Sequence, residues 1–305
     1  MTIRKYITLA ILALSVCSCK NDSPSDGRLN VVTTTSMITD LVQNIGGDYV
    51  NLQGLMGAGV DPHLYKASAG DVTKLSNADI IFYNGLHLEG KLVEVFEKMN
   101  ATQVTQVPLG ESLDKSTLIG SDYFASNYDP HVWFNIDYFK QFVGEVTSTL
   151  SRKDPSNATS YAANAETYLK KLTALEDQIK ATIETLPAEK RVLVTAHDAF
   201  NYFGKSYGFE VVGLQGLSTA TEAGVQDVQR LSQFIIDKKV KAIFVESSVP
   251  RRTIEALQAA VQSKDHEVAI GGSLYSDALG NAGTEEGTYI GMFTYNVNTI
   301  VEALR

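Results

Sequence analysis

Two of the five histidines in this sequence, His63 and His131, each stand third in the tripeptide Asp-Pro-His. Proline restricts the backbone just before each imidazole, and the aspartate two residues earlier can accept a hydrogen bond that orients the ring. His63 and His131 are therefore predicted to be held in fixed orientations, as ligands of a metal ion are. Asp61 and Asp129 are predicted to support these two imidazoles without binding the metal themselves.

A third histidine, His197, follows an apolar run and is expected at the carboxyl end of a strand, where open α/β sheets bind ligands. Spacing leaves two carboxylates that could join it, Asp277 and Glu246, each after a later expected strand. Three imidazoles and a carboxylate suit a four- or five-coordinate transition metal, whereas calcium and magnesium need more oxygen ligands. His87 and His266 lack the Asp-Pro setting and are expected to be structural or exposed.

The elements that would carry these residues are short β-branched runs that alternate with longer helical stretches. Four strands are predicted in the first half of the chain, near residues 29–35, 50–56, 78–85 and 103–107. Four more are predicted in the second half, near residues 191–195, 209–213, 241–245 and 267–271. The expected fold class is α/β, with two lobes that each contain a mainly parallel sheet flanked by helices. The metal would then lie in the groove between the lobes.

One long helix is predicted between the two halves, because apolar residues recur there at spacings of three and four. These residues are Tyr161, Ala165, Tyr168, Leu172, Leu175, Ile179, Ile183 and Leu186. Asp154 and Pro155 are expected to cap and begin this helix, and Pro187 to end it. A helix from Pro155 to Leu186 would be roughly 45 Å long, enough to run along two stacked lobes. A coiled coil is the alternative, but the apolar stripe is short for one.

The first segment has the features of a bacterial secretory signal, with Arg4 and Lys5 before a short apolar run. Cys19 follows the small residue Ser18 in a context that resembles a lipobox, and is predicted to carry the lipid. The expected organisation has five parts. They are a lipoprotein signal peptide (1–18), a lipid-anchored flexible tether (19–28), an N-terminal metal-binding lobe (29–153), a linking backbone helix (154–187) and a C-terminal metal-binding lobe (188–305).

Composition argues against several classes of partner. The 305 residues have a formal net charge of −9, and they contain no concentrated basic region of the kind that binds nucleic acid. No later stretch approaches the ~20 apolar residues of a membrane span, so contact with the membrane is expected through the N-terminal lipid only. The protein is expected to be a monomer in the cell envelope, on the periplasmic or extracellular side.

Six short motifs, in this order along the chain, resemble those of the TroA-like (cluster A-I) metal-binding solute receptors of ABC importers. They are Asp-Pro-His-Leu-Tyr at 61–65, Asn-Gly-Leu-His-Leu-Glu at 84–89, Asp-Pro-His-Val-Trp at 129–133, His-Asp-Ala-Phe at 197–200, Glu-Ser-Ser-Val-Pro at 246–250 and Tyr-Ser-Asp-Ala-Leu-Gly at 275–280. Together they are highly specific, and the resemblance covers essentially the whole mature chain. It implies two α/β lobes joined by one long helix, with the metal held between them.

The resemblance also implies a ligand set, a cargo and partners. It assigns the ligands to His63, His131, His197 and Asp277, and makes Glu246 a residue that supports a ligand. It implies delivery of Zn²⁺ or Mn²⁺ to the permease and ATPase of an ABC transporter. Histidine in the third ligand position is typical of zinc-associated members, so zinc is favoured. Manganese stays open because residues 109–128 lack the histidine-rich loop of the zinc-dedicated branch.

Two other functional classes are weighed against the receptor. A zinc hydrolase needs a metal-bound water and a nearby glutamate, often in the motif His-Glu-x-x-His, which this sequence lacks. No catalytic residue is therefore assigned, and the chain is not expected to be an enzyme. A metal-binding surface adhesin would share the same fold, and metal-dependent binding to a permease would distinguish a receptor from it.

Overall fold

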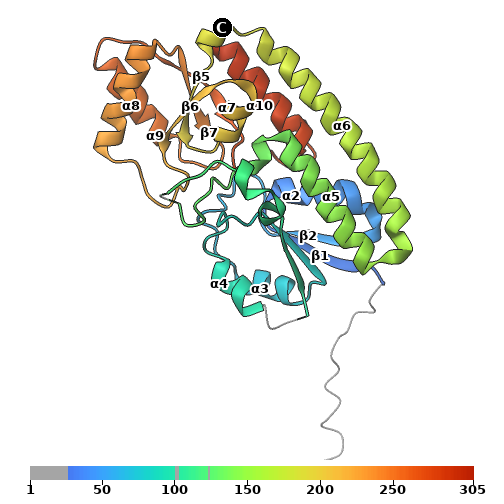
Figure 1. Ribbon diagram of the computed structural model, residues 1–305. Coiled ribbons are helices and arrows are strands. Elements are labelled where there is room, and N and C mark those ends of the chain that lie inside the picture. Colours follow the sequence, from blue (N-terminus) through green and yellow to red (C-terminus); the bar gives the residue numbers. More distant parts are fainter. Residues whose placement is uncertain (1–26, 100–102, 123) are drawn as a thin grey trace, which may run out of the picture.

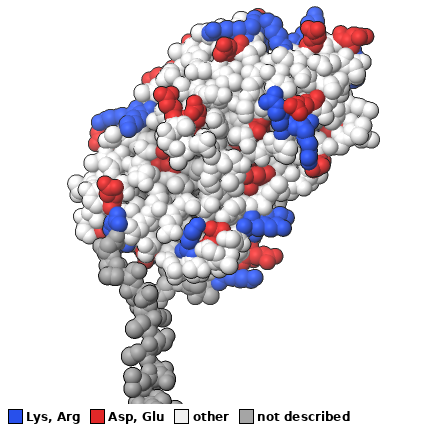
Figure 2. All heavy atoms as spheres, turned by 180° about the vertical axis from the view of Figure 1, so that it is seen from behind, with Lys and Arg blue, Asp and Glu red and all other residues white. Residues whose placement is uncertain are grey.

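The computed structural model describes residues 27–305 except 100–102 and 123 (Figure 1). The predicted signal peptide, Cys19 and nearly all of the tether lie outside the described residues. Within the described part of the chain, no helix is both long enough and apolar enough to cross a membrane. On the face shown in Figure 2, basic and acidic side chains are interspersed, with wide uncharged areas between them.

The first lobe contains a parallel sheet with the strand order β2-β1-β3-β4. Its strands are β1 (Leu29–Thr33), β2 (Val50–Gly54), β3 (Ile80–Tyr83) and β4 (Thr105–Pro108). Its helices are α2 (Ser36–Gly46), α3 (Ala69–Ser76), α4 (Val93–Met99) and α5 (Ile136–Lys153). The chain leaves β1 towards β2 on one side and leaves β3 towards β4 on the other, so the loops that follow the neighbouring strands β1 and β3 diverge and leave room for a ligand at the carboxyl edge of the sheet.

The second lobe contains two parallel pairs of strands, β5–β6 and β7–β8, with β5 beside β7. The strands are β5 (Val192–His197), β6 (Glu210–Gln215), β7 (Ala242–Glu246) and β8 (Ala269–Leu274). The helices are α7 (Asn201–Tyr207), α8 (Val225–Lys238), α9 (Arg252–Gln262) and α10 (Tyr289–Leu304). The α/β fold class is confirmed, and every predicted strand occurs within three residues of its expected ends.

Short 3-10 helices connect several of these elements. They are η1 (Gly47–Tyr49), η2 (Leu109–Ser112), η3 (Lys115–Thr117), η4 (Val132–Phe134), η5 (Pro155–Asn157), η6 (Ala188–Lys190) and η7 (Glu285–Gly287).

The predicted long helix is present as α6 (Ala158–Glu184); the seven residues of the predicted apolar stripe that lie in it are buried, and so is the eighth, Leu186, just beyond its end. It packs against α2 and α5 of the first lobe and against α10 of the second, and runs along both lobes (Figure 1). Asp154 occupies the cap position and Pro155 begins the first turn, as predicted, but the Asp154 carboxylate makes no capping hydrogen bond to the backbone. The first turn is the 3-10 helix η5, in which the Asn157 N–H bonds to the Asp154 carbonyl, so the Asp154 carboxylate accepts from side chains such as Tyr161 instead.

The largest hydrophobic core extends through both lobes. Phe139 of α5 stacks on Tyr289 of α10, and Phe134 stacks on Phe200 at a ring-centroid distance of 4.4 Å. Two smaller cores lie within single lobes, one under α8 and α9 and one under α3 and α4. The lobes are therefore joined by packed side chains as well as by α6, and this shared packing limits how far they can separate.

A capping box at the start of α3 holds the chain that follows His63. Asp71 accepts hydrogen bonds from the Ser68 N–H (3.0 Å) and from the Tyr65 hydroxyl (2.9 Å), and Lys74 lies 3.3 Å away. Partial burial disfavours the charged form, but hydrogen bonds from these three residues outweigh it and lower the pKa of Asp71 to about 2. The negative charge therefore stabilises the folded state.

Replacing Asp71 by asparagine is expected to lower the free energy of unfolding by about 2 kcal/mol at pH 7. Because the folded pKa lies below the unfolded one, this contribution is complete above pH ~4 and falls as the pH drops towards 2. Denaturant unfolding of both proteins measures it, and the difference at pH 3 should be about half that at pH 7. A difference that stayed constant with pH would show that the charge of Asp71 does not stabilise the fold.

Candidate metal centre

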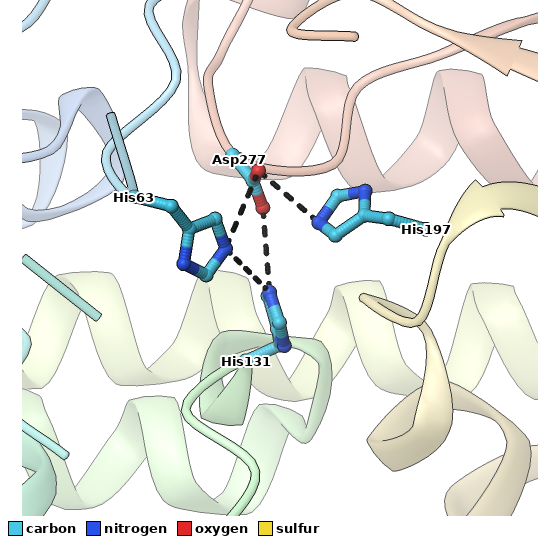
Figure 3. Close-up of side chains that lie close together, drawn as sticks. All are labelled: His63, His131, His197 and Asp277. Atoms are coloured by element: carbon cyan, nitrogen blue, oxygen red, sulfur yellow. Dashed lines mark hydrogen bonds and ion pairs between the residues drawn. The ribbon is translucent and has the colours of Figure 1, made fainter. Parts of the chain in front are cut away.

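Four side chains from distant parts of the sequence converge at the interface of the lobes (Figure 3). One ligand atom from each of His63, His131, His197 and Asp277 lies within 4.8 Å of the other three. All four residues are buried, and the most exposed of them, His63, is 4% exposed. These are the four residues that the sequence proposed as ligands, and the structure brings all of them together.

Three of the four follow strands, as expected. His63 lies in the loop between β2 and α3, His197 is the last residue of β5, and Asp277 follows β8 after two intervening residues. His131 is the exception, because residues 109–130 separate it from β4 and it immediately precedes η4.

Carboxylates lie close to the far side of two imidazoles and set their orientation. His131 Nδ1 lies 2.7 Å from Asp129 Oδ1, and His197 Nδ1 lies 2.6 Å from Glu246 Oε2. A carboxylate accepts a proton from an imidazole, so each Nδ1 is the ring atom that carries a proton when a metal is bound, and each Nε2 faces the cluster, where it can bind the metal. Glu246 also accepts the His197 backbone N–H at 2.9 Å.

Asp129 accepts the backbone N–H of His131 at 2.9 Å as well as its ring N–H, whereas Asp61 bonds to the backbone of its histidine and not to the ring. Asp61 Oδ1 accepts the backbone N–H of His63 at 2.8 Å, so it anchors the chain of His63. The second oxygen of each aspartate accepts from the opposite lobe: Thr219 Oγ1 donates to Asp61 at 2.6 Å, and Asn201 Nδ2 donates to Asp129 at 3.0 Å. Sequence analysis missed both donors. Asn201 lies one turn beyond His197, whereas nothing in the pattern around Thr219 singled it out.

The charges in the cluster are strongly coupled. Burial lowers the pKa of His63 to about 3, against the attraction of Asp277. Burial also opposes a charge on His197, but the Asp277 and Glu246 carboxylates outweigh it and raise the His197 pKa. Burial disfavours the Asp277 carboxylate, yet the neighbouring imidazoles outweigh this effect and lower its pKa. The centre is therefore built to hold a carboxylate together with positive charge.

The spacing of the ligand atoms fits one transition-metal ion. Metal–nitrogen bonds of about 2.0–2.1 Å in a tetrahedron place neighbouring ligand atoms about 3.3 Å apart. His63 Nε2 and His131 Nε2 are 3.3 Å apart, and Asp277 oxygens lie 3.2 Å from His197 Nε2, 3.6 Å from His131 Nε2 and 3.9 Å from His63 Nε2. Among the described residues, buried Asp277 Oδ1 has no hydrogen-bond donor, as expected of an oxygen reserved for a cation.

The two remaining histidines lie elsewhere. His87 is exposed and meets the edge of Phe124, and His266 is partly exposed in the turn before β8. Across the described residues, the four-residue cluster is the one group of three or more His, Cys, Asp or Glu side chains that could hold a metal ion.

The sequence is similar to a known protein family over nearly its whole length. The family described as zinc-uptake complex component A, periplasmic, matches residues 31–303. The chain belongs to this family. Its relatives include the zinc-binding protein TroA of Treponema pallidum (strain Nichols), 47% identical over 99% of both chains. Another is the manganese-binding lipoprotein MntA of Bacillus subtilis (strain 168), 46% identical over 98% of this chain and 97% of that protein.

Among solved structures, the periplasmic zinc-binding protein TroA from Treponema pallidum superposes with a TM-score of 0.89. The match covers 91% of this chain and 99% of that one, at 49% identity. The resemblance predicted from the six motifs is thereby confirmed.

Proposed function

We propose that this member of the zinc-uptake component A family is an extracytoplasmic receptor that captures a divalent transition metal between its lobes. It delivers the ion to the permease of an ABC importer that is driven by its ATPase. The observation that carries the proposal is the buried convergence of three imidazoles and one carboxylate from both lobes. A site in which protein side chains supply all four metal ligands suits capture of the ion, whereas a hydrolase needs one coordination position open for water.

The proposed ligands are His63, His131 and His197 through Nε2, and Asp277 through its carboxylate. Asp129 and Glu246 hold two of the imidazoles, and Asp61 holds the backbone of the third. Such partners fix the ring orientation and raise the basicity of the ligand. No residue is assigned a catalytic role.

The favoured cargo is zinc, with manganese next. Imidazole-rich sites bind zinc more tightly than manganese, as the general order of divalent metal affinities requires. Similarity alone does not separate the two, because relatives named for zinc and for manganese are almost equally identical to this chain.

The boundaries of the signal peptide, tether and lobes are proposed as the sequence predicts them. The signal peptide comprises residues 1–18, Cys19 carries the lipid and residues 19–28 form the tether, in keeping with the word lipoprotein in the name of the Bacillus relative. The lobes comprise residues 29–153 and 188–305, joined by the helix of 154–187. The chain works as a monomer at the outer side of the membrane.

Purification without added metal, followed by elemental analysis and metal competition, tests this function. We expect about one zinc ion per chain, and zinc should displace bound manganese because the ligand set favours it. Manganese retained against an equal concentration of zinc would make manganese the cargo. A protein that bound neither ion would contradict the receptor proposal. Binding of the metal-loaded chain to its permease is then measured, because a receptor should show it and a surface adhesin should not.

A further inference from the structure

The loop that carries Asp277 is attached to the first lobe, although it belongs to the second half of the chain. We define the Asp277 loop as residues 276–288, between β8 and α10. Just after Asp277, the Leu279 N–H donates to Ser36 Oγ at 2.8 Å. Just before it, the Ser276 carbonyl accepts from Trp133 Nε1 at 3.0 Å. Ser36 begins α2 and Trp133 lies in η4, so both partners belong to the first lobe.

The far end of the Asp277 loop is held by the same lobe. The Tyr289 N–H, at the first residue of α10, donates to Asp40 Oδ2 of α2 at 3.1 Å. The Tyr289 hydroxyl donates to the carbonyl of Trp133 at 2.6 Å, and its ring stacks on Phe139. A carboxylate at a helix N-terminus also interacts favourably with the helix dipole. Both ends of the loop are therefore attached to first-lobe groups.

Attachment to the second lobe weakens before Asp277 is reached. Tyr275 exchanges two hydrogen bonds with Asn296 of α10, at 2.9 and 2.7 Å. Beyond Tyr275, Ser248 after β7 lies 3.1 Å from the Ser276 hydroxyl and 3.5 Å from Asp277 Oδ2, the latter at the limit of a hydrogen bond. The backbone is therefore bonded to the second lobe at Tyr275, and from Ser276 onward it is bonded to the first lobe.

We propose that Ser36 and Trp133 are positioning residues for the Asp277 carboxylate. Their hydrogen bonds fix the backbone on both sides of Asp277. The Trp133, Ser276 and Leu279 ends of these bonds are buried, so water cannot replace a lost donor or acceptor without cost. Three of the four proposed ligands, His63, His131 and Asp277, are then held by the first lobe, and the fourth, His197, is held by the second. This inference rests on the proposed metal site.

Ser36→Ala and Trp133→Phe test the inference, and Ser248→Ala is the comparison on the second-lobe side. Zinc affinity is measured by competition with a chelator, and visible absorption of the Co²⁺-loaded proteins reports the ligand geometry. We expect Ser36→Ala and Trp133→Phe to weaken zinc binding about 10- to 100-fold and to change the Co²⁺ spectrum. Ser248→Ala should weaken binding less than Ser36→Ala does, and Ser36→Thr, which keeps the hydroxyl, should retain the affinity and the Co²⁺ spectrum of the unaltered protein.

The inference is overturned if Ser248→Ala weakens binding more than Ser36→Ala does. It is also overturned if Ser36→Ala lowers only the unfolding temperature and leaves the Co²⁺ spectrum unchanged, because Ser36 would then be structural. His63→Ala is measured in parallel. Loss of binding in His63→Ala with none in Ser36→Ala or Trp133→Phe rejects this inference alone, whereas full binding in His63→Ala rejects the metal site itself.

Discussion

Zinc affinity is expected to fall about 100- to 1,000-fold when His63 or His197 is replaced by alanine. Structural zinc sites with four protein ligands bind with about 10–16 kcal/mol, so one ligand accounts for roughly 3–4 kcal/mol, and each 1.4 kcal/mol is a factor of ten. The two imidazoles come from different lobes, so equal losses would show that both lobes bind one ion. Chelator competition measures the affinities.

His63→Ala is the cleaner of the two variants. Burial keeps this imidazole neutral in the metal-free protein, because it lowers the His63 pKa to about 3, so truncation removes no buried charge. His197→Ala removes a group that balances Asp277 and Glu246, so its fold must be checked by circular dichroism and thermal unfolding. His266→Ala is the matched control, since His266 lies in a surface turn away from the cluster. Equal affinity in all three variants would refute the proposed ligands.

Zinc binding is also expected to weaken at least about tenfold for each unit that the pH falls from 7 to 5, because at least one proton is displaced per ion. Two carboxylates raise the pKa of His197 against the effect of burial, so the metal-free protein holds a proton there. The metal requires the neutral ring, and acid therefore favours the metal-free state. His63, with a pKa of about 3, contributes no proton in this range.

Glu246→Gln provides the matched variant for the pH dependence. It removes one of the charges that raise the His197 pKa, so the decline in affinity should begin at lower pH than in the unaltered protein. Calorimetry in buffers of different ionisation enthalpy counts the protons directly. Affinity that stayed flat between pH 7 and 5 would contradict imidazole ligation.

Local patterns were sufficient to predict the elements and three of the proposed ligands. Strand positions follow from short β-branched runs and α6 from an apolar stripe, because backbone periodicity is encoded in neighbouring residues. The Asp-Pro-His repeat marked His63 and His131, and a strand end marked His197. The choice of Asp277 over Glu246 came from resemblance to a family, since both carboxylates occupy similar places in the pattern.

Contacts between the lobes could not be predicted in the same way. Thr219 and Asn201 bond to the two aspartates from across the interface, and Ser36 and Trp133 bond to the loop of a ligand more than 140 residues away. Such pairings depend on how α6 and the shared core orient one lobe against the other, which no short stretch of sequence encodes. Residue types and periodicity thus determine which groups can bind a metal, whereas packing between the lobes determines which groups hold them in place.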